Sequence, residues 1–425
     1  FILQDAEEAG YFYHDLTQVM GSRRVLFFPS GYRRAAKYGQ RDAANEILRT
    51  EVVTSLAAGE PVFVVTSPEA VAEKVVSKKN IDERRLTIRQ GMAQNLIELE
   101  HTLIDFGFLQ TDYVYEPGQF AVRGSILDVF SFSCELPYRV DFFGDEIDSI
   151  RTFEVESQLS RDKKEHVEIV PELATLSDEK VSFLSFLPSD TLLVMKDLLY
   201  VCEKVGHIYN EGFSSQTMTE RLEGKTEMEQ HLIRREMQRE CQLVAPSLFR
   251  EEISAFRRIE VGVRPTGTPQ TTITFNVSPQ PLFHKNFDLL MSTLEDYLSQ
   301  AYTLYILADS KKQQQRLRDI FEERGAPYEG GSVPFVPIDK TLHEGFADND
   351  LRVCLFTDHQ IFDRFHKYNL KSDQARAGKM ALTLKELQEM EPGDFIVHVD
   401  FGIGKFAGLV RVPAGDSYQE MIRLV

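Results

Sequence analysis

The stretch that decides the fold reads Gly118-Gln-Phe-Ala-Val-Arg-Gly-Ser-Ile-Leu-Asp-Val-Phe130 and soon continues as Leu136-Pro-Tyr-Arg-Val-Asp-Phe-Phe-Gly-Asp-Glu-Ile-Asp-Ser-Ile-Arg-Thr-Phe153. Short runs rich in aromatic and β-branched residues follow one another closely in it, and we expect them to be strands: 120–123, 126–130, 138–143 and 147–153. Between them lie Gly124, Pro137 and the pair Gly144-Asp145, which are typical of hairpin turns. The stretch therefore predicts a β-rich unit of antiparallel strands.

The side chains of this β-rich unit separate into two faces, because successive residues of a strand point in opposite directions. In 120–123 and 138–143 the even-numbered residues are aromatic or apolar, so they build a core face. The odd-numbered positions place Arg123, Arg139 and Phe143 on the opposite face. Arginine and aromatic side chains often anchor protein interfaces, which makes these three residues candidate contacts. A covering helix above Phe143 and ordinary surface ion pairs of the arginines would explain the same pattern, and the sequence leaves both interpretations open.

The residues before this unit indicate α/β architecture. Val25–Phe28 and Val62–Val65 are short apolar runs, as expected of strands buried on both faces. Ser67-Pro68 has the composition of a helix start, and apolar residues recur at helical spacing over 92–106. We expect a parallel sheet with helices on both sides.

The residues after it predict further domains. Residues 195–265 are helical and highly charged in pattern, and 264–270 is a Pro/Thr/Gly-rich linker. A second α/β unit follows, with strands at 303–307, 333–338 and 351–356 and a helix from Ser310 towards Arg324. After a polar connector, 392–399 and 404–412 are typical of a small antiparallel barrel. The domain boundaries that we predict are 1–107 and 196–265 for the first α/β domain, 108–195 for its β-rich insert, 271–368 for the second α/β domain, 369–386 for a linker and 387–425 for the barrel.

Length, charge and cysteine content limit the class of protein. A chain of 425 residues is expected to form several domains. Its net charge of −18 argues against a large nucleic-acid footprint, because affinity for the phosphate backbone comes mainly from Lys and Arg. No apolar run approaches the ~20 residues of a membrane span, the first residues do not resemble a signal peptide, and the four cysteines are far apart. We expect a cytoplasmic protein with reduced thiols and no membrane partner, and a piece of a longer chain, because both ends fall inside apparent strands.

Three patterns resemble parts of catalytic or ligand-binding motifs but lack the sequence context that such sites need. Gly224-Lys225-Thr226 matches the end of a phosphate-binding loop, but no strand precedes it. Gly402-Ile-Gly404 is half of a dinucleotide fingerprint and has no helix after it. His359, Asp363 and His366 would share one face of a helix and could hold zinc in a hydrolase, although a polar helix face explains them equally well. The sequence therefore predicts no catalytic residue, no cofactor and no metal site.

The stretch Gly118–Phe153 closely resembles the UvrA-binding domain that is shared by UvrB and the bacterial transcription-repair coupling factor family (Mfd). A later stretch, Pro392-Gly-Asp-Phe-Ile-Val-His-Val-Asp-Phe-Gly-Ile-Gly-Lys-Phe-Ala-Gly408, resembles the start of the RNA polymerase interaction domain of Mfd, which UvrB lacks. The order of the two motifs favours Mfd. The resemblance implies a UvrB-like α/β domain interrupted by the insert, a second small α/β domain, and a truncated Tudor/SH3-like β-barrel.

The resemblance also implies partners and contact residues. UvrA contact in the family falls on the residues that correspond here to Arg123, Arg139 and Phe143. The RNA polymerase β subunit is expected to meet a strand of the barrel near Arg411 and Val412. The implied function is a scaffold that links RNA polymerase stalled at DNA damage to nucleotide excision repair by recruiting UvrA.

The motor of the family, which uses ATP and Mg²⁺ and supplies most of the DNA contact, is not in this sequence. We therefore expect no enzymatic activity of this chain, whereas a full-length family member would be an ATP-dependent DNA translocase. The alternative that the sequence leaves open is a UvrB-like module that binds damaged DNA and hydrolyses ATP.

Overall fold

The structure is a computed structural model in which the chain forms two compact units, 1–374 and 375–425. It describes every residue except 23, 33–42, 135, 156, 174–179, 212–221, 223–225, 229, 231–241, 263–264, 325–332, 365–392, 399–401, 415–416 and 425. No helix in the described part of the chain is long and apolar enough to cross a membrane.

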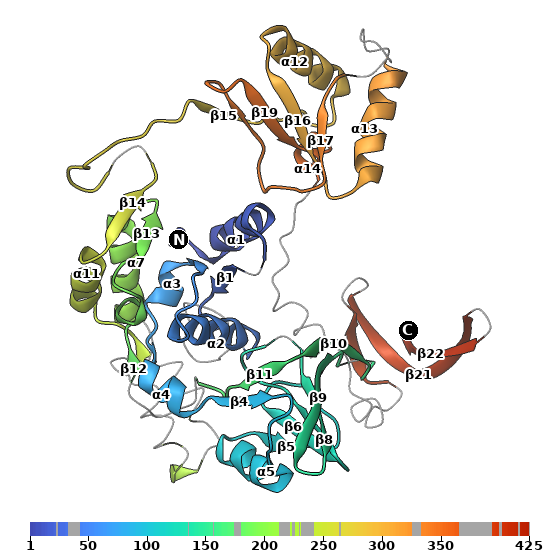
Figure 1. The fold of residues 1–425 in the computed structure, drawn as a ribbon. Helices are drawn as coiled ribbons and strands as arrows, with labels where there is room; N and C mark the ends of the chain where they lie inside the picture. The colour runs from blue at the N-terminus through green and yellow to red at the C-terminus, as the bar shows by residue number, and fades with distance from the viewer. Residues whose placement is uncertain are drawn as a thin grey trace. The chain divides into compact units, whose positions relative to one another are not determined.

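A parallel sheet forms the centre of the first α/β domain (Figure 1). Strand β1 (Val25–Phe28) pairs in parallel with β2 (Phe63–Thr66), and β13 (Leu192–Met195) pairs in parallel with β14 (Arg257–Glu260). Ile2 joins the two pairs, because it bridges both Thr66 and Met195. The sheet thus includes strands from both sides of the β-rich insert, as an interrupted domain requires.

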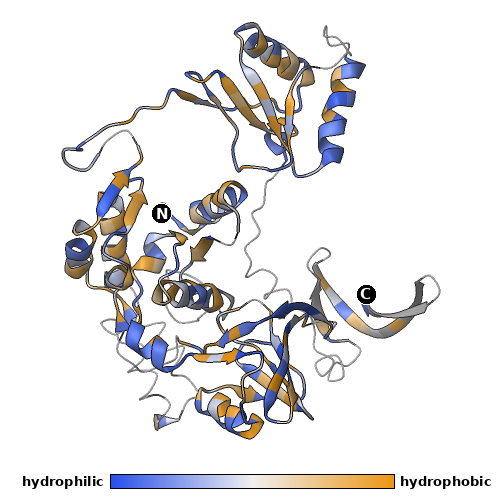
Figure 2. Ribbon diagram, viewed as in Figure 1, coloured by the Kyte–Doolittle hydropathy of each residue, from blue (hydrophilic) through white to orange (hydrophobic). Residues whose placement is uncertain are grey.

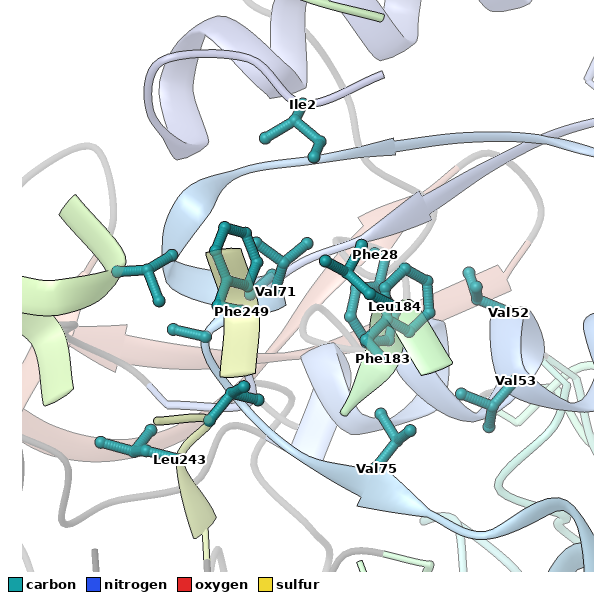
Figure 3. Packing of buried hydrophobic residues seen from close by; sticks show 14 of the residues in the cluster. Ile2, Phe28, Val52, Val53, Val71, Val75, Phe183, Leu184, Leu243 and Phe249 are labelled. Atoms are coloured by element: carbon teal, nitrogen blue, oxygen red, sulfur yellow. The ribbon is translucent and has the colours of Figure 1, made fainter. Parts of the chain in front are cut away.

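Helices cover both faces of this sheet, as predicted for strands that are apolar on both sides. The helices are α1 (Ala6–Met20), α2 (Ala43–Ala57), α3 (Pro68–Val71), α4 (Lys78–Glu83), α6 (Phe183–Phe186), α7 (Leu198–Glu211) and α11 (Pro246–Ser254). Val25 and Phe27 pack towards α1, whereas Leu26 and Phe28 pack into the larger core. In that core Phe28 stacks on Phe183 with ring centroids 4.1 Å apart, next to Val52 (Figure 3).

A buried ion pair ties the end of β1 to the helices that follow. The Arg49 guanidinium lies 3.2 Å from the Glu73 carboxylate and 4.2 Å from the centre of the Phe28 ring. Glu73 also accepts hydrogen bonds from Ser30 and from the backbone N–H of Gly31. Burial raises the pKa of Glu73, and Arg49 opposes that shift. Both charges are compensated inside the core, so this network is structural.

The β-rich insert is a six-stranded sheet with the order β10-β9-β8-β7-β6-β5. Its strands are β5 (Leu109–Gln110), β6 (Gln119–Arg123), β7 (Ile126–Val129), β8 (Tyr138–Phe143), β9 (Glu146–Phe153) and β10 (Ser160–Lys164). All neighbours from β6 to β10 are antiparallel, as predicted. Gly124 and Gly144 each adopt a φ of +64° in the tight turns between strands, a conformation that favours glycine.

The two faces of this sheet are covered to different extents. The inner face packs against α5 (Leu96–Asp105), where Leu99 and Leu103 are fully buried, and against the pair of β4 (Leu86–Arg89) and β11 (His166–Ile169). The outer face carries a small second core of Val114, Ala121, Phe130 and Phe153. Strand β10, with the sequence Ser-Arg-Asp-Lys-Lys, is exposed along its whole length and hydrophilic in Figure 2. Charges of this kind protect a sheet edge from unwanted pairing.

The second α/β domain contains a five-stranded sheet with the order β15-β18-β19-β16-β17. Its elements are β15 (Val277–Pro279), α12 (Phe287–Ser299), β16 (Thr303–Leu307), α13 (Lys311–Glu323), β17 (Val336–Ile338), β18 (Phe346–Asp348), β19 (Val353–Thr357) and α14 (Asp358–Ile361). Strand β16 is parallel to both β17 and β19. The predicted helix is confirmed, with Ser310 at its N-cap position, although the Ser310 side chain makes no capping hydrogen bond. Elsewhere in unit 1, β3 (Val75–Val76) and β12 (Lys180–Val181) form an antiparallel pair.

The described residues of unit 2 form three antiparallel strands, β20 (Phe395–His398), β21 (Gly402–Ala414) and β22 (Ser417–Leu424). Strand β20 pairs with the first residues of β21, and β22 pairs with the rest. The predicted antiparallel sheet is therefore observed. Closure into a Tudor/SH3-like barrel stays a prediction.

Two helix predictions need correction. The helix expected over 92–106 begins only at Leu96, because the Asn95 side chain caps it by accepting from the N–H groups of Ile97 and Glu98. The shared face of His359, Asp363 and His366 required a helix through these positions, but α14 ends at Ile361 and Asp363 adopts a φ of +51°, outside any right-handed helix, while His366 lies outside the described residues.

Helix α1 also contacts the second α/β domain. The Asp15 carboxylate accepts a hydrogen bond of 2.8 Å from the backbone N–H of His343, and the Tyr11 ring stacks on the His343 imidazole at 3.6 Å. The Lys340 ammonium donates to the carbonyl of Gln18. Burial raises the pKa of Asp15 to about 6, which the His343 N–H opposes and nearby Glu344 reinforces.

We predict that Asp15→Asn strengthens this contact above pH 6. An aspartate whose pKa is raised by burial stabilises the contact below pH 4 and loses that contribution as the pH rises through about 6. Asparagine keeps the acceptor oxygen and carries no charge. Hydrogen exchange of the His343 amide should be several-fold slower in the variant than in the wild type at pH 8, with little difference at pH 4. Exposed Asp148→Asn is the control, and faster exchange in Asp15→Asn would contradict the prediction.

Candidate partner-docking face

The outer face of the six-stranded sheet brings the three predicted contact residues together. We call Arg123, Asp128, Arg139 and Phe143 the docking face. They come from three adjacent strands, β6, β7 and β8. Asp128 lies directly opposite Arg139 in the register of β7 and β8, and opposite Ala121 in the register of β6 and β7. The antiparallel pairing thus places one carboxylate between two arginines.

Asp128 is the centre of this arrangement, with a side chain that is 1% exposed. Its carboxylate accepts from Arg139 Nε at 2.7 Å and from the Arg139 terminal nitrogen at 2.8 Å. It also accepts from Arg123. The two-point contact fixes the plane of the Arg139 guanidinium, because two of its nitrogens bond to the two carboxylate oxygens.

Further contacts complete the position of Arg139. Its guanidinium lies 4.5 Å from the centre of the Phe153 ring, and it donates to the carbonyl of Gln158 at 3.0 Å. The hydrogen bonds to Asp128 raise the pKa of Arg139 above its ordinary value, so the side chain is charged at all physiological pH values. Arg139 is therefore held by three contacts before any partner arrives.

A second ion pair lies on the same face. Arg151 of β9 pairs with Asp141 of β8, which also accepts a hydrogen bond from Ser149. Three arginines and two aspartates thus form a cluster with one net positive charge. Most of the arginine charge is already compensated within the protein, so the face offers directed N–H groups more than a strong positive field.

Phe143 differs from its neighbours in being open to solvent. Its side chain is 83% exposed, whereas the preceding residue, Phe142, packs into the inner core. The interpretation that a helix covers Phe143 is wrong, since α5 lies on the opposite face. Isolated exposed apolar residues are common, but a largely exposed phenylalanine on the same face as a fixed arginine pair has the composition of an interface anchor.

The predicted polymerase-contact residues lie in unit 2. Arg411 and Val412 belong to β21, where they pair with Glu420 and Gln419 of β22. Strand β20 pairs only with positions 402–405 of β21, so no described strand pairs with the other edge at 411–412.

The sequence reasoning missed Asp128 and the Asp141–Arg151 pair. A signal for Asp128 was present, because it is a single acidic residue inside the apolar run Ile-Leu-Asp-Val-Phe and falls on the same face as Arg123. Buried carboxylates of this kind are normally paired. The identity of the pairing partner depends on strand register, which the sequence did not supply.

The patterns with catalytic appearance gain no support. Among the residues that the structure describes, no group of three His, Cys, Asp or Glu side chains could hold a metal. His359 is buried, with Nε2 at 2.9 Å from the carbonyl oxygen of His343, and His366 lies outside the described residues. Gly224 and Lys225 also lie outside them. Gly402 and Gly404 open a β-strand and not a helix.

Comparison with known proteins identifies both of the regions singled out above. A family model described as the UvrB interaction domain matches residues 86–174, and a model described as the CarD-like/TRCF RID domain matches 390–425. The transcription-repair-coupling factor of Staphylococcus aureus (strain bovine RF122 / ET3-1) is 22% identical over 466 aligned residues, which cover 96% of this chain and 40% of that relative. Over nearly its whole length the chain is thus similar to transcription-repair-coupling factors.

A second transcription-repair-coupling factor, from Staphylococcus epidermidis (strain ATCC 35984), is 23% identical over 469 residues and covers the same shares of the two chains. The chain thus spans about 40% of the length of the coupling factors that it matches. The docking face lies inside the matched UvrB interaction domain, and Arg411 and Val412 lie inside the second matched domain.

We predict that Asp128→Ala destabilises the β-rich insert by about 2–4 kcal/mol, because it leaves two guanidinium groups without their buried partner. Arg123 is the more exposed of the two and can turn to solvent, which keeps the effect below the upper limit for buried pairs. Denaturant-dependent hydrogen exchange of β7 and β8 in the whole chain measures the loss. Asp148→Ala, an exposed change in the same sheet, should stay within about 0.5 kcal/mol. Equal stability of the two variants would show that the pairing contributes nothing.

Proposed function

We propose that this chain is a docking platform that links RNA polymerase stalled at DNA damage to nucleotide excision repair by recruiting UvrA. The observation that supports it best is the docking face: Phe143 is 83% exposed on the same face of the sheet as two arginines that Asp128 holds in place. This face lies in the part of the chain that matches the UvrB interaction domain. UvrA is the partner that the resemblance to the shared UvrA-binding domain implies.

The geometry suits recognition of a protein because the contact groups are ordered in advance. Immobilising a long side chain on binding costs roughly 0.5–1.5 kcal/mol, and Arg139 has already lost that freedom through Asp128, Gln158 and Phe153. Phenylalanine has only two rotatable side-chain bonds, so Phe143 adds buried area at low entropic cost. The partner would bury the ring and bond to the exposed edges of the guanidinium groups.

The second part of the proposal concerns RNA polymerase. We propose that its β subunit meets the edge of β21 at Arg411 and Val412, where no described strand pairs. An open strand edge can pair with a strand of another protein through main-chain hydrogen bonds. The two docking surfaces lie in different compact units, so one chain could hold both partners.

We propose that this chain acts by binding and not by catalysis. ATP hydrolysis and DNA translocation in a whole coupling factor would belong to a motor outside this sequence, together with most of the contact with DNA. In such a protein, the docking face could be covered until the motor engages. The net charge of −18 supports protein partners over a large nucleic-acid footprint.

The direct test is binding of purified UvrA to the wild-type chain and to Arg139→Ala and Phe143→Ala. Each substitution removes a central interface side chain and should weaken binding about thirtyfold or more, which corresponds to ~2 kcal/mol. Titration calorimetry or biolayer interferometry with immobilised chain measures the dissociation constant.

The control is Ile97→Ala. Ile97 is 62% exposed on α5, at the opposite face of the same sheet, so its removal should leave UvrA binding unchanged. Thermal unfolding of each variant shows whether the fold is kept. Wild-type affinity in both Arg139→Ala and Phe143→Ala would rule out this face as the UvrA site.

The polymerase contact is tested with Arg411→Glu combined with Val412→Asp. Reversing charge and adding a carboxylate at the open edge should weaken binding to the polymerase β subunit about tenfold or more, while UvrA binding in unit 1 is unchanged. Arg423→Glu makes the same charge reversal at an exposed position of β22 and is the matched control. Equal losses in the two variants would mean that general charge, and not the β21 edge, governs the contact.

A further inference from the structure

We propose that Tyr113 and Tyr115 are a second, aromatic part of the docking face and that the same partner, UvrA, contacts both rings. The inference rests on the proposed function and extends it beyond Arg123, Arg139 and Phe143. Neither tyrosine belongs to the residues that the sequence motif marks. Their position in the structure is what assigns them to the face.

Both tyrosines project into solvent next to each other. Tyr113 is 50% exposed and Tyr115 is 42% exposed, and their ring centroids are 6.5 Å apart. Tyrosine presents a rigid apolar ring and a hydroxyl that forms hydrogen bonds, which is why it is enriched at protein interfaces. A neighbouring pair of half-exposed rings offers a large contact area at low entropic cost.

The residue between the two tyrosines differs from them in burial. Val114 is fully buried in the small outer core with Ala121, Phe130 and Phe153. Val114 thus anchors the middle of the segment in this core, while the rings on either side of it remain half-exposed.

The backbone of this segment is also fixed. The N–H groups of Tyr115 and Glu116 both donate to the Gln119 side-chain carbonyl, at 2.8 and 3.0 Å. The Thr111 hydroxyl donates to the carbonyl of Tyr113 at 2.9 Å. The tyrosines thus sit on a pinned segment, so little conformational entropy remains to be lost on binding.

Arg123 makes the tyrosine pair continuous with the rest of the docking face. Its guanidinium lies 4.8 Å from the centre of the Tyr113 ring and is bound to Asp128 at the same time. Asp128 in turn holds Arg139. A chain of direct contacts therefore runs from the tyrosines to the centre of the site.

The charge around the rings favours a protein over a nucleic acid. Tyrosine and arginine together could also stack on unpaired bases, which requires an excess of basic residues along the strand. Here Arg123 is paired with the Asp128 carboxylate and donates to the backbone carbonyl of Asp112, and the chain carries a net charge of −18. A charge-balanced aromatic surface fits a folded protein partner.

The test compares UvrA binding of Tyr113→Ala, Tyr115→Ala and the double variant with that of Phe143→Ala. We expect each single change to weaken binding about fivefold or more and the double change roughly twentyfold or more, as for side chains at an interface. Tyr113→Phe, which keeps the ring over Arg123, should retain most of the affinity. Phe275→Ala removes a 73% exposed aromatic ring from another domain and should have no effect.

The variants distinguish a failure of this inference from a failure of the proposed function. A loss with Phe143→Ala but wild-type binding by both tyrosine variants overturns this inference and leaves the proposed function standing. A loss with Tyr113→Ala alone also overturns it, because Tyr113 would then act only by positioning Arg123. Failure of the wild-type chain to bind UvrA overturns both proposals. Tyrosine-dependent binding of a single-stranded oligonucleotide with unchanged UvrA binding would assign the rings to nucleic acid and overturn the inference.

Discussion

The buried carboxylate of Asp128 is the constraint on which the docking face depends. A charged group that is 1% exposed must be compensated, and two arginines supply the compensation from neighbouring strands. If the arginines moved away, the buried carboxylate would lose its partners at a large cost in free energy. Their guanidinium planes are therefore fixed to the sheet. Because Asp128 faces Arg139 in the strand register, a shift of one residue between β7 and β8 would destroy the site together with the core.

The same alternation that fixes the charges also builds two cores of unequal size. The inner face of the sheet is fully covered by α5 and by the β4–β11 pair, which gives the insert its stability. The outer face is covered only around Phe130 and Phe153 by the segment that contains Val114. The small outer core therefore leaves the end with Phe143 open and the two tyrosines half-exposed. The proposed partner site lies where this outer core ends.

The sequence predicted what local periodicity determines. Strands β6 to β9 and the face that holds Arg123, Arg139 and Phe143 follow from a period of two, which needs no knowledge of neighbours. Asp128 as the shared partner required the register. The helical spacing of His359 and Asp363 does not place them on one helix face, because His359 turns inward to the carbonyl of His343 and Asp363 leaves the helical region. Tyr113 and Tyr115 were not predictable, since their exposure depends on the packing around the buried Val114.

The charge balance of the docking face determines how it can bind. The chain carries a net charge of −18. An exposed cluster of unpaired arginines on it would attract any polyanion, and the affinity for that polyanion would fall steeply as the salt concentration rises. Here the aspartates compensate most of the arginine charge inside the protein, so the attraction at long range is weak. Binding then depends on close contact: burial of Phe143 and the tyrosine rings, and hydrogen bonds from guanidinium groups already held in place. A surface of this kind selects its partner by shape and hydrogen-bond geometry, which suits a scaffold that must recruit one protein in the presence of abundant nucleic acid.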